Sequence, residues 1–232
     1  MIKEALQYIV GLGKTEIVEI DGHKYSTSGL NFIKELSPIN LQVSTLTGLV
    51  DYVRANIDSF KSYYLIQVVD HEEVRLLSPL KKDMSRDCFI LAKAETPRIT
   101  FNSPVNAENF NIMLQSCFLQ NEDRATILKI VGNIKEENVR TTGDDGVSQT
   151  VTAKVGIAKV ADVVVPNPVT LVPFVTFAEI EQPEIKYVFR MQDGPRAALY
   201  EADGGAWKLK TMLAIKEYLR KELINFKVRI IA

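Results

Sequence analysis

The first half of the chain shows a helical pattern of hydrophobic residues in three places. Apolar residues recur at spacings of three and four over residues 2–10, 44–57 and 106–119, which predicts three helices. Ser44 or Thr45 and Asn106 stand where N-caps of the second and third helices are expected.

Runs with a two-residue period lie between these predicted helices. Residues 15–26 alternate around Ile17 and Ile20 and turn at Asp21-Gly22, which predicts a hairpin. Three further runs are rich in β-forming residues, YYLIQVV, EVRLLSP and DCFILAKAE. They predict a small antiparallel sheet, with the helix at 106–119 packed on it.

The second half of the chain is patterned mainly as strands. ILKIVGNI and GVSQTVTAKVGI favour strands, and IKYVFRM and AALYEA predict two more. The run VTLVPFVTF, among prolines, suits a sheet edge that a second copy could cover. After these strands, residues 206–224 predict a long helix, and NFKVRIIA a last strand. The apolar stripe of that helix is expected to hold Leu209, Met212, Ile215, Leu219 and Leu223.

These elements predict an α+β fold for residues 1–232. The N-terminal half mixes helix and sheet, and the C-terminal half is mainly antiparallel β, closed by the long amphipathic helix. The pattern suggests two lobes, 1–119 with helices and a small antiparallel sheet, and 120–232 with an antiparallel sheet and the C-terminal helix. A chain of 232 residues is long enough to bury a sizeable core.

Composition narrows the classes of protein that fit. The formal net charge of -1 argues against a chain-wide electrostatic grip on nucleic acid. The start of the chain lacks a signal peptide's features and no run is long enough for a membrane helix, so we expect a cytoplasmic protein without membrane contact. Cys88 and Cys117 have neither CxxC spacing nor a partnered histidine, so no disulfide, metal site or cofactor is expected.

Basic residues concentrate near the C-terminus. Seven of them, against two glutamates, lie between Lys208 and Arg229. Lys216, Arg220 and Lys221 are the candidate phosphate contacts. The two glutamates interrupt the pattern and stacking aromatics are sparse, so a solvated amphipathic helix is favoured over a nucleic-acid surface.

The stretch EADGGAWKLK precedes this helix and has two interpretations. In the first, Asp203 is an N-cap, the two glycines let the chain turn, and Trp207 closes over the core. In the second, free amides at the helix start bind an anion with help from nearby lysines. The candidate ligand-binding residues here are Asp203, Gly204, Gly205, Trp207, Lys208 and Lys210.

Three other groups carry candidate chemistry. Gln149 interrupts the apolar face of its strand, so its amide must find a partner, either a ligand or a neighbouring loop. Asp144 and Asp145 lack the further oxygen ligands of a calcium loop and are expected in an exposed turn. His71 lies in the run DHEE, which is typical of a solvated hairpin turn.

Five segments in order, FNIMLQSCF, GDDGVSQTVTAKVG, VPNPVTLVPFVTF, EQPEIKYVFRM and ALYEADGGAW, resemble a group of uncharacterised proteins encoded by bacteriophages and prophages. The resemblance includes STLTGLVDYVRANID and EVRLLSPL in the front half. It implies viral origin and action inside a bacterial cell, and it supplies no catalytic residues.

The sequence therefore favours a non-enzymatic phage accessory protein that works as a homo-oligomer, with a host or phage protein as a further partner. One alternative is an enzyme acting on a nucleotide or another phosphorylated small molecule, with Asp144, Asp145, His71 or Asp203 supplying acid, base or metal contacts. Another is a nucleic-acid-associated factor in phage recombination.

Overall fold

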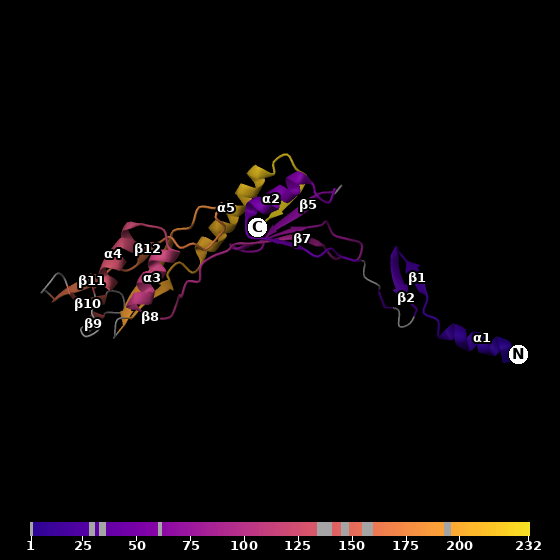
Figure 1. Ribbon diagram of the computed structural model, residues 1–232, viewed down its shortest axis with the longest axis horizontal. Helices are drawn as coiled ribbons and strands as arrows, with labels where there is room; N and C mark the ends of the chain where they lie inside the picture. The colour runs from indigo at the N-terminus through magenta and orange to yellow at the C-terminus, as the bar shows by residue number, and fades with distance from the viewer. Residues whose placement is uncertain are drawn as a thin grey trace.

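The computed structural model describes residues 2–27, 31–32, 36–59, 62–133, 141–144, 149–154, 160–192 and 196–232. Within this part, five helices and four sheets alternate along the chain (Figure 1). The predicted α+β class is confirmed. No helix in the described ranges combines the length and hydropathy needed to span a bilayer.

A five-stranded sheet occupies the middle of the molecule. Its order is β15-β5-β6-β7-β4, and one face is covered by α2 (Leu46–Ala55) and α5 (Ala206–Glu222). Thr45 is the N-cap of α2, since its side chain accepts a hydrogen bond from the Gly48 amide at 3.1 Å. The strands are β4 (Leu41–Val43), β5 (Tyr64–Val68), β6 (Glu73–Leu77), β7 (Cys88–Lys93) and β15 (Val228–Ile231).

This sheet is mixed, whereas the sequence predicted an antiparallel one. The strands β5, β6 and β7 pair antiparallel, but β15 pairs parallel with β5 and β4 pairs parallel with β7. Each of the two strands that pair in parallel is next to a helix along the chain. Helix α2 follows β4, and α5 precedes β15. A helix that crosses a sheet can bring the chain back in the same direction, which a hairpin cannot.

A second sheet is antiparallel and has four strands in the order β12-β13-β14-β8. Alternate residues of β13 are buried, and α3 (Ala107–Cys117) and α4 (Glu122–Gly132) pack with them in one hydrophobic cluster. Asn106 caps α3 as predicted, with the Asn109 amide 2.8 Å from its side-chain oxygen. The strands are β8 (Val105–Asn106), β12 (Val169–Leu171), β13 (Ile185–Gln192) and β14 (Arg196–Glu201).

The prediction of a strand at ILKIVGNI is wrong, because these residues lie largely in α4. Asn121 caps this helix by accepting a hydrogen bond from the Arg124 amide at 2.8 Å. Ile127 and Val131 are buried four residues apart in the cluster that holds α3 and the sheet, and Ile130 is buried as well. A short apolar run is compatible with either element, and here the cap and the packing select the helix.

A separate three-stranded antiparallel sheet is formed by β9 (Thr141–Asp144), β10 (Gln149–Lys154) and β11 (Val160–Val165). It confirms strand structure in the part of GVSQTVTAKVGI that is described. Val147, Val155 and Ile157 of this run lie outside the described residues.

The long C-terminal helix is confirmed as α5, but its apolar stripe is displaced from the predicted one. Leu209 is 61% exposed, whereas Trp207, Thr211 and Ile215 are buried. The buried line thus runs at four-residue spacing from Trp207, and Leu209 falls on the opposite side of the helix. Ile215, Leu219 and Leu223 are buried as predicted.

Two hydrophobic clusters form the core, and α5 contributes to both. Trp207, at its start, packs with the four-stranded sheet, α3 and α4. Ile215 and Leu219 pack with α2 and the five-stranded sheet. This grouping differs from the predicted lobes 1–119 and 120–232, because α3 packs with later strands and α5 with earlier ones.

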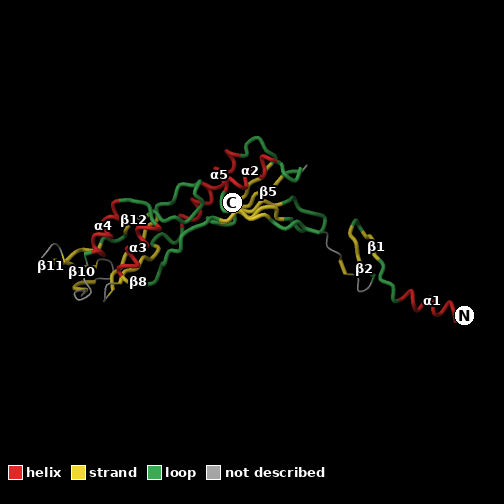
Figure 2. The backbone as a smooth tube through the Cα atoms, viewed as in Figure 1, coloured by secondary structure: helices red, strands yellow, loops and turns green. Residues whose placement is uncertain are grey.

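The first described residues form an N-terminal arm, which comprises α1 (Ile2–Leu12), β1 (Ile17–Ile20), β2 (His23–Ser26) and β3 (Asn31–Phe32). The predicted helix and hairpin are both present, and Asp21 and Gly22 turn the chain with positive φ. Figures 1 and 2 show the arm standing apart from the two clusters. At the hairpin turn, a Cβ on Gly22 would lie 3.1 Å from Lys82 Nζ, so the arm meets the body there.

Candidate functional site

The start of α5 is built around two glycines. Gly204 and Gly205 have φ values of 64° and 79°, a conformation that glycine adopts without strain. The predicted N-cap at Asp203 is wrong, because Gly205 is the N-cap residue. Asp203 instead stabilises the preceding turn, with Oδ1 accepting a hydrogen bond from the Gly205 amide at 3.0 Å.

Trp207 is buried, as the structural interpretation of this stretch predicted. Its side chain is 5% exposed and its Nε1 donates a hydrogen bond to Glu201 Oε1 at 3.3 Å. The ring of His71 meets it edge-on, with ring centroids 4.7 Å apart and planes at 77°. Lys208 Nζ lies 5.5 Å from the indole centroid. Trp207 therefore connects the core of the four-stranded sheet with the turn before β6 of the five-stranded sheet.

His71 is half-buried, which corrects the prediction that DHEE is a solvated turn. The packing of Trp207 against its ring removes it from water, and its carbonyl accepts a hydrogen bond from Thr176 Oγ1 at 2.5 Å. Burial lowers the pKa of His71, and Lys208 adds to this, while the charges of Glu72, Asp70 and Glu201 oppose it. The imidazole thus favours its neutral form.

Acidification is expected to destabilise the fold through this histidine. A lowered pKa means that the unfolded chain binds the proton more readily, so this contribution is present above a pH of about 6.5 and is lost as the pH falls below it. His71→Phe keeps an edge-on ring but cannot be protonated. Urea unfolding at pH 7.5 and 5.5 should show a smaller loss of unfolding free energy for this variant than for the wild type. Equal losses would contradict the assignment.

A cleft of about 680 Å³ opens beside the first turns of α5. It brings together Asp203, Trp207 and Lys210 from the sequence-predicted ligand residues, whereas Gly204, Gly205 and Lys208 do not line it. Carboxylates and amines share its wall, and Thr211 and Gln182 are engaged in hydrogen bonds to the backbone. The other lining residues are Thr170, Glu181, Pro183, Glu184, Lys186, Ala206 and Ala214.

The cleft does not bring together the residues for which the sequence suggested acid, base or metal roles. His71 is not among its lining residues, and no group of three histidine, cysteine, aspartate or glutamate side chains there could hold a metal ion. The side chain of Asp144, and Asp145 entirely, lie outside what the structure describes. The acid, base or metal roles suggested for Asp144 and Asp145 thus stay predictions, and His71 and Asp203 do not line one cleft.

Gln149 serves the fold. Its side chain is 3% exposed, its Nε2 donates to the Met191 carbonyl and its Oε1 accepts from the Met191 amide, both at 2.8 Å. These bonds satisfy the amide and the carbonyl of Met191, which lies on β13 beyond the residues that pair with β12. Gln149 thus joins β10 to the four-stranded sheet. Of the two partners that the sequence left open for its amide, a ligand or another part of the chain, the structure shows the second.

The candidate phosphate contacts lie on the second half of α5, away from the cleft lining. Arg220 and Lys221 are exposed and Lys216 is half-buried. Arg220 NH1 is 2.5 Å from Glu217 Oε1, so an acid on the same helix offsets part of its charge. Arg229 lies over the ring of Tyr63 at 4.4 Å. A role for these residues in phosphate binding stays a prediction.

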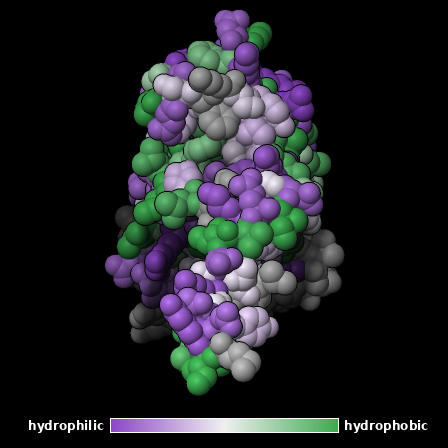
Figure 3. All heavy atoms as spheres, turned by 90° about the vertical axis from the view of Figure 1, so that its right-hand side faces the viewer, coloured by the Kyte–Doolittle hydropathy of each residue, from purple (hydrophilic) through white to green (hydrophobic). Residues whose placement is uncertain are grey.

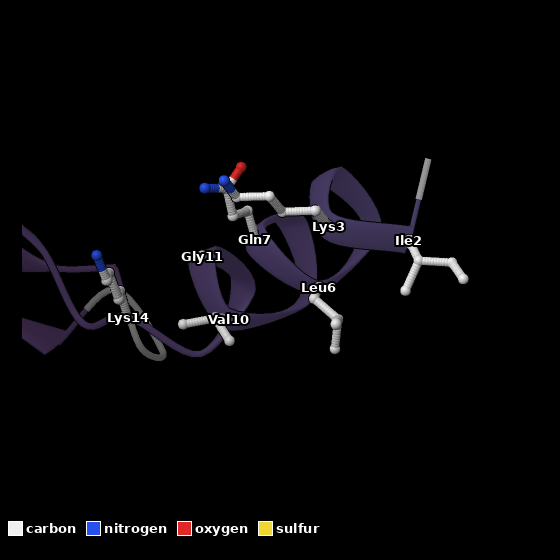
Figure 4. A pocket seen from close by; sticks show the side chains of 7 residues that line it. All are labelled: Ile2, Lys3, Leu6, Gln7, Val10, Gly11 and Lys14. Carbon is white, nitrogen blue, oxygen red and sulfur yellow. The ribbon is translucent and has the colours of Figure 1, made fainter.

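The feature that the sequence did not reveal is the exposed apolar surface of the arm. Ile2, Leu6, Ile9 and Val10 on α1 are between 57% and 81% exposed. Figure 4 shows Ile2, Leu6 and Val10 on one side of the helix, with Lys3 and Gln7 on another. The hollow drawn there is lined by α1 and Lys14, so it is an open helix surface. Figure 3, viewed from the arm's end, shows hydrophobic side chains exposed among polar ones.

No family model, curated protein or solved structure matched this chain.

Proposed function

We propose that this chain is a non-enzymatic phage or prophage accessory protein that works inside the bacterial cell as a homo-oligomeric binding protein, assembled through its N-terminal arm. The observation that carries assembly is the exposed apolar surface of α1 and β1. The phage origin and cytoplasmic location rest on the segments that resemble phage and prophage proteins.

The arm needs a partner for stability. A helix of 11 residues is marginal in water, and most helical stability in proteins comes from packing of an apolar face. The side chains of β1 are also exposed on both faces, including Ile17 at 65% and Ile20 at 49%. A small sheet without a covered hydrophobic face is marginal as well. Burial of these side chains against a second copy would supply the missing packing.

The charge of the arm favours a protein partner. Residues 2–27 carry three lysines and four carboxylates, so they lack the basic excess that attracts phosphate backbones or anionic lipid. A second copy of a chain with nearly balanced charge meets little long-range repulsion.

The sheet edge at VTLVPFVTF, which the sequence suggested as a surface for assembly, is a weaker candidate than the arm. In the run VTLVPFVTF, Val169, Leu171 and Phe177 are buried. At the exposed edge of β12, the Thr170 amide donates to Asp123 Oδ2 at 2.7 Å, and the Thr170 carbonyl accepts from Asn121 Nδ2 at 2.8 Å. Side chains of this same chain thus occupy the groups that a partner strand would use.

Light scattering tests the assembly. The wild-type protein should be oligomeric at micromolar concentration, and the double variant Leu6→Glu, Ile9→Glu should be monomeric, because it places charges on the apolar surface of α1. Both positions are exposed, so the fold of the body should be retained. The matched control is Gln7→Glu, on the polar side of the helix, which should stay oligomeric. A monomeric wild type would overturn the proposal.

A further inference from the structure

A recess with both apolar and polar lining lies on the body of the molecule, where α2 and α5 end beside the start of β5. Its volume is about 460 Å³, and Val53, Tyr64 and Phe226 supply apolar surface. We call it the terminal groove. Its remaining lining residues are Asn56, Ser62, Asn225 and Lys227.

Three large hydrophobic side chains in or next to the lining residues along the chain are exposed. Ile57 follows Asn56 and is 62% exposed, and Ile224 precedes Asn225 and is 79% exposed. Phe226, in the lining itself, is 38% exposed. Large aliphatic and aromatic side chains left in water beside a recess are typical of a docking surface.

The apolar surface of α1 has the shape that a groove can cover. At 100° per residue, Ile2, Leu6 and Ile9 lie within one narrow sector, and Tyr8 and Val10 extend it on either side. The apolar arc therefore exceeds half of the circumference. A flat contact would leave part of it in water, whereas a groove with projecting rims contacts a helix on several sides.

We propose that α1 of each copy lies in the terminal groove of a second copy, in a reciprocal exchange of arms. This inference rests on the proposed assembly through the arm and assigns its acceptor. Figure 1 places α1 well away from the ends of α2 and α5 of its own chain, so the occupant comes from another copy. Exchange of one element between identical chains is a common route to dimers, because the two surfaces are present in equal number.

Charge and area support a second copy as the occupant. Lys227 is the only charged residue that lines the described part of the groove, so the recess presents little charge to the apolar side of α1. One helix of 11 residues, about 16 Å long, is too short to bury the roughly 800 Å² per partner of a standard stable interface. Reciprocal exchange buries two such helices, so the total buried area comes closer to that of a standard stable interface.

Mixing two variants tests the exchange. The arm variant is Leu6→Glu, Ile9→Glu, and the groove variant is Ile57→Glu, Ile224→Glu. Each alone should dimerise about 100-fold more weakly than the wild type, because every contact buries a carboxylate. Mixed, they should form a 1:1 heterodimer, since the intact arm of the groove variant fits the intact groove of the arm variant. Analytical ultracentrifugation with one variant fluorescently labelled measures both quantities.

A control separates groove chemistry from added charge. Leu209→Glu, Leu213→Glu places two carboxylates on α5 at positions 61% and 47% exposed, and this variant should dimerise like the wild type. If the groove variant alone dimerises normally, the arm binds elsewhere, and the inference fails while the proposed assembly stands. If the arm variant also dimerises normally, both fail. Two monomeric variants that do not form a heterodimer would likewise overturn the exchange.

Discussion

Replacing Trp207 with alanine should lower the free energy of unfolding by about 3 to 5 kcal/mol. The indole is 5% exposed and packs in the cluster of the four-stranded sheet. Its removal leaves a cavity at the start of α5 and deletes the edge-on contact with His71. The helix continues from there into the other cluster, so the loss should weaken the packing between the two sheets. Denaturant unfolding of the variant and the wild type measures the difference.

The matched variant Trp207→Phe should cost less, about 1.5 kcal/mol, because a phenyl ring retains most of the apolar contact and loses the hydrogen bond to Glu201. Trp207 is the only tryptophan, so its emission should be blue-shifted in the folded protein and move to the red on unfolding. A loss within about 0.5 kcal/mol for the alanine variant, or a red and readily quenched native emission, would contradict the buried position.

Features set by neighbouring residues could be predicted from the sequence. The caps at Thr45 and Asn106 follow from a side-chain oxygen placed just before a helical pattern. The hairpin at Asp21-Gly22 follows from turn chemistry, and β13 and β14 follow from alternation. In each case the deciding interaction spans a few residues, so the sequence contains it directly.

Features set by distant residues could not be predicted in this way. His71 and Trp207 are far apart in the chain, and their contact depends on how α5 packs between two sheets. The parallel pairing of β15 with β5 likewise depends on where the last helix returns the chain. At α4, the local pattern was ambiguous, and the hydrogen bonds of Arg124 to the Leu114 and Gln115 carbonyls of α3 fix the helix in place.

The candidate sites also divide into those that neighbouring residues determine and those that depend on distant parts of the chain. The stretch around Trp207 was identified by its composition, and the structure places four of its residues at one cleft. The exposure of the apolar side of α1 could not be predicted, because its periodicity predicts a helix without indicating what covers that side. An amphipathic pattern is the same for a helix on its own core and for one that binds another chain.

Replacing Gln149 with leucine should lower the free energy of unfolding by about 2 to 4 kcal/mol. Leucine has a volume similar to that of glutamine. The variant should therefore lose hydrogen bonds while it keeps most of the packing at this buried position. Both the amide and the carbonyl of Met191 would lose their partners, and each buried unsatisfied group costs about 1 to 3 kcal/mol. Urea unfolding of the variant gives the total effect.

The same substitution one residue beyond Met191 provides the control. Gln192 lies on β13 without a side-chain hydrogen bond in the described structure, so Gln192→Leu should change stability by no more than about 0.5 kcal/mol. Amide hydrogen exchange adds a local measurement, because the Met191 amide should exchange faster in Gln149→Leu and remain protected in Gln192→Leu. If the two variants are equally stable and Met191 stays protected in both, the amide of Gln149 does not hold β10 to the sheet, and its burial needs another explanation.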